Sequence, residues 1–317
     1  MLKSLNQSNI GVFVLAYKRL IHLKKTLKSI NKYLPRKDKI HIFMDTYSKE
    51  QDLKTIKSIN KVNNYLKNLP KKKYIVIFRK KRFGVKKNWF EAYDYMFKKY
   101  KKVICIEDDI LIKKNFFEFM YYYLNKYENN KKIMNITGFG TKVKLSRDYN
   151  YDCFITKRPM SWGQASWSRV WYNFKKIKMN HLIILKNKFN NRLLISGGED
   201  LLTYMVLDYL KYSNSLQIWW SWHIINNNGF CLNPTKSLVK NIGYDGTGQH
   251  SKEGDQLNSS KNIKRNKKKL TEIIFDEKIN KNFLKNFEIK KRTYIIFNYM
   301  PIWIISILMK IKKHLNI

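Results

Sequence analysis

Short apolar strands alternate with amphipathic helices along the first third of the chain, and this alternation limits the possible folds more than any other feature. The run 10–16 is almost wholly apolar, as expected of a strand buried on both faces. Further strands are predicted at 40–44, 74–78 and 103–106, and the helices between them at 20–34, 50–66 and 85–100. Such an order predicts right-handed crossovers and an α/β fold with a doubly wound, mostly parallel sheet.

The carboxyl ends of these strands are where a ligand site is expected, because open parallel sheets bind ligands there, at the point where the strand order reverses. The segments at these ends are Ala16-Tyr17-Lys18-Arg19, Asp45-Thr46, 79–84 and Glu107-Asp108-Asp109. Neither GxGxxG nor GxxxxGK[ST] occurs in the chain, which argues against a dinucleotide fingerprint and a P-loop.

The alternation defines a first half-domain, 1–132, that carries these strand ends. The segment 133–250 is richer in aromatic residues and glycine, with one clear helix at 201–212, and is predicted to be a second half-domain that completes the site. A polar stretch at 251–270 predicts a linker, and 271–317 forms a basic and apolar C-terminal tail.

The tail contains a strongly apolar run from Tyr294 to Met309 with basic residues on both sides. A membrane-spanning helix needs about 20 apolar residues, so this run is short for a span. The pattern favours a segment that lies on an anionic membrane surface, held by its basic flanks. A core helix with solvated lysines at its ends is the alternative.

The net charge is +41, from 64 basic and 23 acidic residues, and it favours anionic partners such as phosphates, anionic lipids or nucleic acid. The excess of lysine together with asparagine and isoleucine also fits a base-composition bias of the source genome. Lysines are spread along the whole chain and no nucleic-acid-binding module is recognised, so we expect no nucleic-acid partner. A basic protein that binds single strands through interleaved aromatics remains the alternative.

Cys105, Cys153 and Cys231 are widely spaced and form no CxxC or Cys/His cluster, which argues against a disulfide framework and a zinc site. The first apolar run leads directly into a helical pattern without a cleavage site for a secretory signal. The expected location is the cytoplasm, peripherally on the inner face of the cytoplasmic membrane.

Three carboxylates, Glu107, Asp108 and Asp109, end the apolar strand at 103–106. Like charges this close are costly unless a cation compensates them. Strand alternation predicts that Glu107 and Asp109 share one face and that Asp108 lies on the other. Oxygen ligands of this kind suit Mg²⁺ or Mn²⁺ held largely through substrate phosphates. A solvated acidic turn or a helix cap before Leu111 is the alternative.

Two further groups are candidate site residues. Glu199 and Asp200 precede an apolar helix and fit a helix cap with acidic residues in the first turn. Trp162 and Trp167 would by default be core aromatics, but Gly163 between them suggests a loop whose rings can pack on a sugar. The tryptophans at 219, 220 and 222 are assigned to the core.

The segment NIGYDGTGQH holds three glycines, Gly243, Gly246 and Gly248, which permit a tight loop. Backbone N–H groups of such a loop can hold a phosphate. His250 is a candidate metal ligand or phosphate hydrogen-bond donor, with a purely structural histidine as the alternative.

One order of motifs runs through residues 10 to 250: VFVLAYKR, IFMD, FGVKKN, VICIEDDILIKKNFFEFM, SWGQASWSRVW, GGEDLL and LVKNIGYDGTGQH. This order resembles a bacterial family of nucleotide-sugar transferases that is similar to N-acetylglucosaminyltransferase I and has the glycosyltransferase A fold. EDD with the aromatic helix after it, and NIGxDGTGxH, are the most specific parts of the resemblance.

The resemblance implies that Ala16, Tyr17 and Arg19 line the nucleoside pocket and that Asp45 hydrogen-bonds the base. A tyrosine ring can stack on a base and a carboxylate can accept from its N–H, although Asp45 alone also fits a turn. Lys87 would meet the phosphates or the sugar of the donor.

The same resemblance implies that Asp109 ligates the metal, that Asp108 reaches the ribose and that Glu107 orients the loop. Asp200 would be the general base that deprotonates the acceptor hydroxyl, with Glu199 as the second candidate, in a reaction that inverts the anomeric carbon.

Two residues depart from the pattern of the family. Arg82 stands where an asparagine before Phe-Gly is usual, and Gln164 stands where a tryptophan is usual. The first departure puts the contact from that loop in question, and the second bears on the choice of donor or acceptor.

Taken with the residues, the resemblance implies a metal-dependent glycosyltransferase. Its donor would be a nucleoside-diphosphate sugar, with a UDP-sugar expected, and its acceptor a hydroxyl of a glycan or lipid-linked molecule in surface polysaccharide or lipopolysaccharide synthesis. A nucleotidyltransferase of similar α/β fold is a further alternative, because it also uses metal-bound carboxylates.

Overall fold

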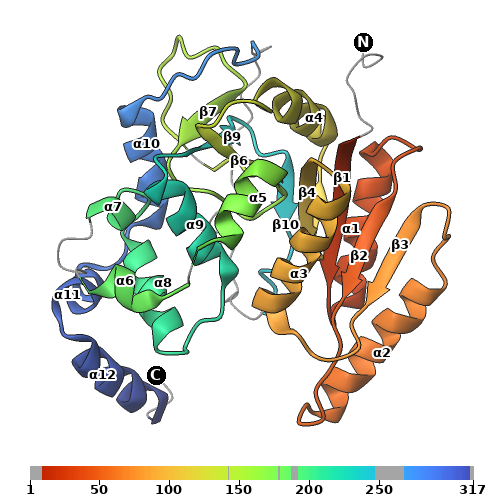
Figure 1. Ribbon diagram of the computed structural model, residues 1–317, viewed down its shortest axis with the longest axis horizontal. Helices are drawn as coiled ribbons and strands as arrows, with labels where there is room; N and C mark the ends of the chain where they lie inside the picture. Colours follow the sequence, from red (N-terminus) through yellow and green to blue (C-terminus); the bar gives the residue numbers. More distant parts are fainter. Residues whose placement is uncertain (1–8, 142, 178, 187–191, 247–267, 315–317) are drawn as a thin grey trace.

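The computed structural model describes residues 9–141, 143–177, 179–186, 192–246 and 268–314 (Figure 1). Its largest element is an eight-stranded sheet in the order β3-β2-β1-β4-β8-β6-β9-β7. The first four strands along the chain, β1 (Ile10–Ala16), β2 (Ile40–Met44), β3 (Tyr74–Phe78) and β4 (Lys102–Glu107), form one parallel half of it. The predicted α/β fold class and the positions of these four strands are confirmed.

The helices of this half are α1 (Leu20–Tyr33), α2 (Leu53–Lys67) and α3 (Gly84–Lys99). The strand order runs 3-2-1-4, so the direction of winding reverses after β3 and the sheet is doubly wound. The helix expected at 50–66 begins instead at Leu53, because the Asp52 side chain caps it by accepting from the Thr55 N–H at 2.7 Å.

The second half extends the same sheet with a mixture of directions. β8 (Gln164–Trp167) is antiparallel to β4 and to β6 (Ile133–Thr137), which is parallel to β9 (Phe230–Pro234). β7 (Cys153–Thr156) closes the edge, antiparallel to β9. The second half is therefore continuous with the first through one shared sheet (Figure 1).

A separate two-stranded sheet joins distant parts of the chain. β5 (Ile110–Ile112), directly after the acidic triplet, pairs antiparallel with β10 (Val239–Asn241). This pairing brings the segment after residue 241 beside the end of β4. The start of the glycine-rich motif and the acidic triplet thus meet, although more than a hundred residues separate them.

Helices cover the second half more extensively than the sequence pattern predicts. They are α4 (Phe116–Lys126), α5 (Ser168–Lys175), α6 (His181–Leu185), α7 (Arg192–Ile195), α8 (Asp200–Tyr209) and α9 (Leu216–Asn226). The predicted helix at 201–212 corresponds to α8, which ends earlier, before the left-handed residue Lys211. α9 went unpredicted because its sequence, LQIWWSWHIIN, is apolar on nearly all sides and shows no amphipathic period.

The tryptophans of the second half mostly lie in the core. Trp171 and Trp220 pack with Trp89 and Tyr93 of α3 in one aromatic cluster, with ring centroids 4.0 to 6.5 Å apart. The predicted core positions of Trp219 and Trp220 are confirmed, since each is 1% exposed. This cluster joins α3 of the first half to α5 and α9 of the second.

The C-terminal segment contains α10 (Glu277–Leu284), a 3₁₀ turn (Lys285–Phe287), α11 (Lys291–Tyr299) and α12 (Ile302–His314). Phe283 is fully buried against Phe154 of β7, so α10 belongs to the packed body. The predicted linker 251–270 lies outside the described residues except for its end, where Leu270 is buried. Among the helices that the structure describes, none is both long and apolar enough to cross a bilayer.

Two buried histidines predict how stability depends on pH. Burial lowers the pKa of His41 and of His223 to about 4, below the unfolded value near 6.5. The folded state therefore binds fewer protons between these values, and stability that is complete above pH 6.5 is lost as the pH falls. We expect a loss of roughly 2 to 3 kcal/mol per histidine, measured as denaturant midpoints between pH 7.5 and 4.5. The double variant His41→Phe, His223→Phe should flatten this dependence, and a flat wild-type profile would contradict the prediction.

Candidate functional site

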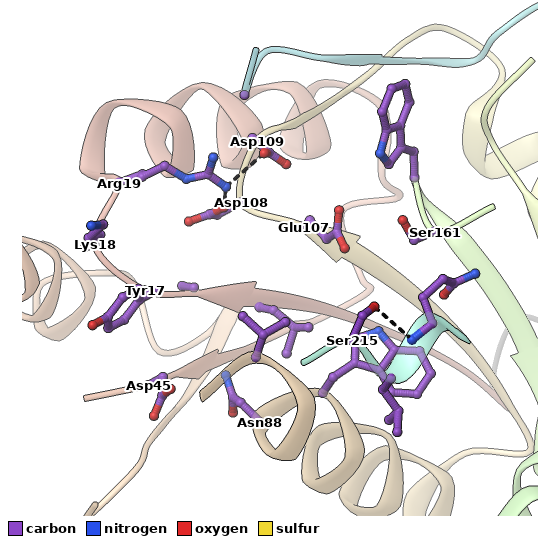
Figure 2. Close-up of a pocket in the computed structure, with 18 of the residues that line it drawn as sticks. Tyr17, Lys18, Arg19, Asp45, Asn88, Glu107, Asp108, Asp109, Ser161 and Ser215 are labelled. Carbon is purple, nitrogen blue, oxygen red and sulfur yellow. Dashed lines mark hydrogen bonds and ion pairs between the residues drawn. The ribbon is translucent and has the colours of Figure 1, made fainter. Parts of the chain in front are cut away.

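A pocket of about 380 Å³ opens at the carboxyl ends of β1 and β4, where the strand order reverses (Figure 2). A volume of this size is typical of small-ligand sites. Its walls come from both halves of the chain, with the strand ends 15–19 and 107–109 on one side and the segments 161–162 and 214–217 on the other. The predicted location at the strand ends is thus where the structure has its pocket.

Arg19 and the last two carboxylates of the triplet form the polar centre of this pocket. Arg19 Nη2 contacts Asp108 Oδ1 and lies 2.9 Å from Asp109 Oδ2 (Figure 2). The backbone here is fixed by the Thr26 hydroxyl, which donates to the Asp108 carbonyl at 2.8 Å, and by the Ile242 N–H, which donates to the Asp109 carbonyl at 2.9 Å. The two aspartates therefore sit on a constrained turn.

The predicted facing of the triplet is wrong. β4 ends at Glu107, and Asp108 and Asp109 form a turn, so the alternation of strand side chains stops before them. Asp108 and Asp109 both face Arg19, whereas Glu107 is turned toward Ser161 on the opposite wall (Figure 2). The triplet is thereby divided into a cation-facing pair and a single carboxylate.

Burial sets the electrostatics of this cluster. It raises the pKa of Glu107 to about 8, with a further contribution from the charges of Asp109 and Asp108. The pKa of Asp108 is raised by burial to about 6, against the opposing effect of Arg19. The site holds more negative charge than one guanidinium compensates, which is the condition expected of a place that receives a further cation.

Asp109 is suited to a divalent cation. Its Oδ1 is buried and makes no hydrogen bond within the described part of the chain, while the side chain lies in the pocket wall. A Cβ added to Gly243 would come within 2.1 Å of Asp109 Oδ2, so glycine there keeps the carboxylate accessible. Within the described ranges no group of three or more His, Cys, Asp or Glu side chains is placed to hold a metal. A metal at Asp109 would then take its other ligands from substrate and water, as Mg²⁺ and Mn²⁺ commonly do. His250 lies outside the described residues.

The end of the pocket next to β2 is built around Asp45, which is 3% exposed. Its oxygens accept from the N–H groups of Thr46, Phe83 and Gly84 at 2.9, 3.0 and 2.9 Å, and Oδ2 also pairs with Arg82. Gly84 adopts φ 74°, which glycine allows without strain. Asp45 thus holds the 82–84 loop, and its capacity to accept from a base is already used.

Arg82 takes a place that the sequence pattern did not assign. Its guanidinium carbon lies 4.0 Å from the centroid of the Tyr17 ring, and both side chains line the pocket. Ala16 lines the same wall. Lys87 is exposed and lies over the Phe83 ring at 4.9 Å, outside the pocket lining, while Asn88 of the same helix faces inward.

The far wall contains Ser161 and Trp162, and Trp162 lies edge-on to Tyr244 at 5.8 Å. Gly163 precedes β8 and accepts from the Gly138 N–H at 2.8 Å without lining the pocket. Trp167 is a core residue, 1% exposed, whose indole N–H donates to the Leu124 carbonyl at 2.9 Å. Of the three residues predicted to contact sugar, the structure brings only Trp162 into the pocket.

The segment 214–217, before and at the start of α9, also lines this wall. Ser215 caps α9 by accepting from the Gln217 N–H, and the Gln217 Oε1 is buried without a hydrogen bond among the described residues. Sequence reasoning missed this segment. The sequence NSLQ carries a capping serine, which could have marked the helix start, but nothing local places it opposite β4.

Asp200 and Glu199 lie outside the pocket lining. Asp200 begins α8 and is paired through both oxygens with Arg158, one contact being 2.8 Å from Nη2 to Oδ2. Arg158 also lies over the Phe287 ring at 3.8 Å, so this buried ion pair ties α8 to the C-terminal segment. The structure does not bring the two candidate bases into contact with the triplet.

The aspartate pair at the switch point and the strand order 3-2-1-4 lie in the first half of the chain, which also supplies the wall of the pocket at the strand ends. Residues 2–146 match the model of the GNT-I family. The GNT-I match contains Tyr17, Asp45 and the whole acidic triplet, and it ends before the segments that build the far wall. The doubly wound sheet and the GNT-I match agree with the glycosyltransferase A fold expected from the sequence.

Comparisons beyond the GNT-I match are more distant. Among the curated proteins none matches the chain. The first solved structure is S. aureus TarS 1–349 in complex with UDP-GlcNAc, with 12% identity, a TM-score of 0.36, and coverage of 53% of this chain and 47% of that one. A mannosyltransferase from Pyrobaculum calidifontis, PcManGT, in complex with GDP-Man and Mn²⁺ has 10% identity, a TM-score of 0.37, and coverage of 68% and 69%. The chain spans about half the length of TarS 1–349.

Proposed function

We propose that the protein is a metal-dependent glycosyltransferase that uses a nucleoside-diphosphate sugar. The observation that carries the proposal is Asp109, which lies just after the carboxyl end of β4, inside the pocket at the switch point of the sheet, and whose buried Oδ1 has no hydrogen-bond partner among the described residues. The GNT-I match over the residues that hold this pair supports the same reading. A UDP-sugar is the donor that we expect.

The donor would lie across the pocket with its base at Tyr17 and its diphosphate at the aspartate pair. Asp109 would hold Mn²⁺ or Mg²⁺, which when bound neutralises the charge that develops on the leaving diphosphate. Asp108 would face the ribose, and Glu107, turned toward Ser161, would lie beside the transferred sugar (Figure 2). Trp162 offers an apolar face on the wall where the sugar and the acceptor would meet.

The general base proposed for the acceptor hydroxyl is Asp200, with Glu199 as the second candidate and inversion as the expected outcome. This role requires that Arg158 release the Asp200 carboxylate when the substrates bind, because a base must reach the proton that it removes. Closure of a loop or domain on substrate binding is common in enzymes. The acceptor that we propose is a glycan or lipid-linked hydroxyl in surface polysaccharide or lipopolysaccharide synthesis.

The C-terminal helices support a proposed location on the inner face of the cytoplasmic membrane. Ile305 anchors α12 to the body with no exposure, whereas Trp303, Ile307 and Ile311 on the same helix are 66%, 48% and 49% exposed. Lysines and an arginine flank these apolar side chains at 290–292 and 310–312. Exposed apolar residues bordered by basic ones are the features of a helix that lies on an anionic bilayer.

We expect Trp303→Asp together with Ile307→Asp to reduce binding to vesicles that contain anionic lipid by at least roughly tenfold, because apolar area is lost and negative charge is gained. Flotation with vesicles with and without phosphatidylglycerol measures this. Leu53→Asp is the matched control, since Leu53 is 74% exposed on α2. Equal flotation of the double variant and the wild type would place the membrane contact elsewhere.

Two other functions make different predictions. A nucleic-acid-binding protein, favoured by the charge of +41, would be stabilised by single-stranded RNA or DNA in a salt-dependent way. A nucleotidyltransferase would release diphosphate from a nucleoside triphosphate.

Thermal denaturation with a panel of nucleotide sugars, nucleoside triphosphates and oligonucleotides, each with and without Mn²⁺, tests the proposed function. A ligand that binds only the folded state raises its stability in proportion to the logarithm of its concentration. We expect a nucleotide sugar with Mn²⁺ to give the largest increase in Tm. An increase with oligonucleotides alone would overturn the proposal.

A further inference from the structure

Arg19 occupies the position between the two aspartates where a metal ion would be expected. A single nitrogen, Nη2, contacts Asp108 and lies 2.9 Å from Asp109 Oδ2. In the described parts of the chain, the ion pairs of both aspartates run to this one side chain. Two oxygens from neighbouring carboxylates that converge on one positive centre are also the arrangement that binds a small cation.

A divalent ion and this guanidinium therefore compete for the same oxygens. Asp109 Oδ2 is engaged by Arg19, and Oδ1 makes no hydrogen bond to any residue in the described ranges. The side chains of Asp108 and Asp109 are 8% and 11% exposed, so water screens the repulsion between two adjacent cations poorly. Metal binding to Asp109 would weaken the contact to Arg19, and Arg19 would in turn weaken the binding of free metal.

The position of Arg19 in the fold would also let its side chain bind a phosphate group within the same pocket. It lies between the end of β1 and the start of α1 and lines the pocket with Tyr17 and Lys18. A guanidinium binds phosphate oxygens through two parallel hydrogen bonds, in the way that it binds a carboxylate. Rotation of the Arg19 side chain alone would exchange one type of anion for the other.

We propose that Arg19 is a resident counter-ion of the Asp108–Asp109 pair, which yields to a divalent metal when a nucleoside diphosphate enters and then binds the diphosphate. This inference rests on the proposed function, because it takes a nucleoside diphosphate as the ligand. If Arg19 moves from the aspartates to the diphosphate in this way, metal and nucleotide bind cooperatively. The coupling is reciprocal, so each ligand increases the affinity for the other by the same factor.

Titration of the full-length protein with Mn²⁺ tests the inference, with free Mn²⁺ measured by electron paramagnetic resonance in the presence and absence of UDP. A titration of UDP alone corrects for its own binding of Mn²⁺. We expect the wild type to bind Mn²⁺ weakly without UDP and at least about tenfold more tightly with UDP, which is a typical size for the coupling between two ligands. Arg19→Gln should bind Mn²⁺ without UDP at least about tenfold more tightly than the wild type, and the effect of UDP should shrink.

Two further variants control for folding and for charge. Arg19→Lys keeps one positive charge but has no planar fork to bridge two carboxylates, so its affinity for Mn²⁺ should lie between those of the wild type and Arg19→Gln. Arg36→Gln removes the same charge from an exposed position and should bind Mn²⁺ like the wild type. If Arg19→Gln is unstable, the lysine variant alone decides the outcome.

The two proposals fail in different ways. In one outcome, Arg19→Gln and Arg19→Lys bind Mn²⁺ with an affinity within twofold of the wild type, and UDP still promotes Mn²⁺ binding. This outcome overturns the proposed role of Arg19 but not the proposal that the protein is a transferase. If the variants bind Mn²⁺ more tightly but UDP has no effect on any of the proteins, Arg19 is supported as the counter-ion. That result overturns its transfer to the diphosphate of UDP and the use of a UDP-sugar donor.

Discussion

We expect Asp109→Asn to abolish Mn²⁺-dependent binding of nucleoside diphosphate and to reduce sugar transfer by at least about a hundredfold. Asparagine keeps the size of the side chain but removes the charge that would hold a divalent ion. Stabilisation of a leaving diphosphate by a metal contributes several kcal/mol to the transition state, which corresponds to this factor or more. Isothermal titration calorimetry with UDP, with and without Mn²⁺, measures the binding, and release of nucleoside diphosphate measures the turnover.

The fold should survive this substitution, because in the part of the chain that the structure describes the Asp109 side chain is ion-paired with Arg19 alone, and Arg19 keeps Asp108 as a partner. Asp148→Asn is the matched control, since Asp148 is exposed on a loop. If Asp109→Asn binds UDP with Mn²⁺ as tightly as the control does, the metal assignment is wrong.

We expect the substitution Asp200→Asn to lower both the stability of the protein and its turnover. Asp200→Asn breaks a buried ion pair in which Arg158 contacts both carboxylate oxygens, and it leaves that arginine buried without its counter-charge. We expect the free energy of unfolding to fall by about 3 to 5 kcal/mol, in the range measured for such pairs. Chemical denaturation at pH 7.5 measures this loss.

A double variant, Asp200→Asn with Arg158→Met, separates the two roles of Asp200. Removal of both charges should restore most of the stability, because no unpaired charge remains buried. If Asp200 is the general base, the double variant still binds the donor but transfers no sugar. Normal transfer by the refolded double variant would assign Asp200 to the structure alone and move the base elsewhere.

The first half of the fold could be predicted because each element leaves a local signal. β1, β2 and β3 begin and end where the apolar runs do, and α1 follows the period of its leucines. Local signals are weaker in the second half. α9 is buried on most sides and therefore lacks a polar face, and the pairing of β5 with β10 depends on segments far apart in the sequence.

The candidate site also has features that the sequence predicts and features that it does not. The position of the acidic triplet at the end of a parallel strand was predictable from topology, but the direction of its side chains was not, because β4 ends at Glu107 and a turn follows. The saturation of Asp45 by the 82–84 loop and the contact of Arg82 with Tyr17 depend on three strand ends meeting in space. Likewise, no pattern near Asp200 indicates that Arg158, in another segment, is its partner.

A crystal of the protein grown with UDP and Mn²⁺, with anomalous scattering recorded at the manganese edge, would show whether Asp109 holds the metal-bound diphosphate of a nucleotide sugar. We expect one manganese peak in contact with an Asp109 oxygen and with phosphate oxygens of UDP, and the uracil ring beside Tyr17. A nucleotide bound outside this pocket, or a manganese peak that Asp109 does not contact, would show that Asp109 is not the metal ligand of a nucleotide site.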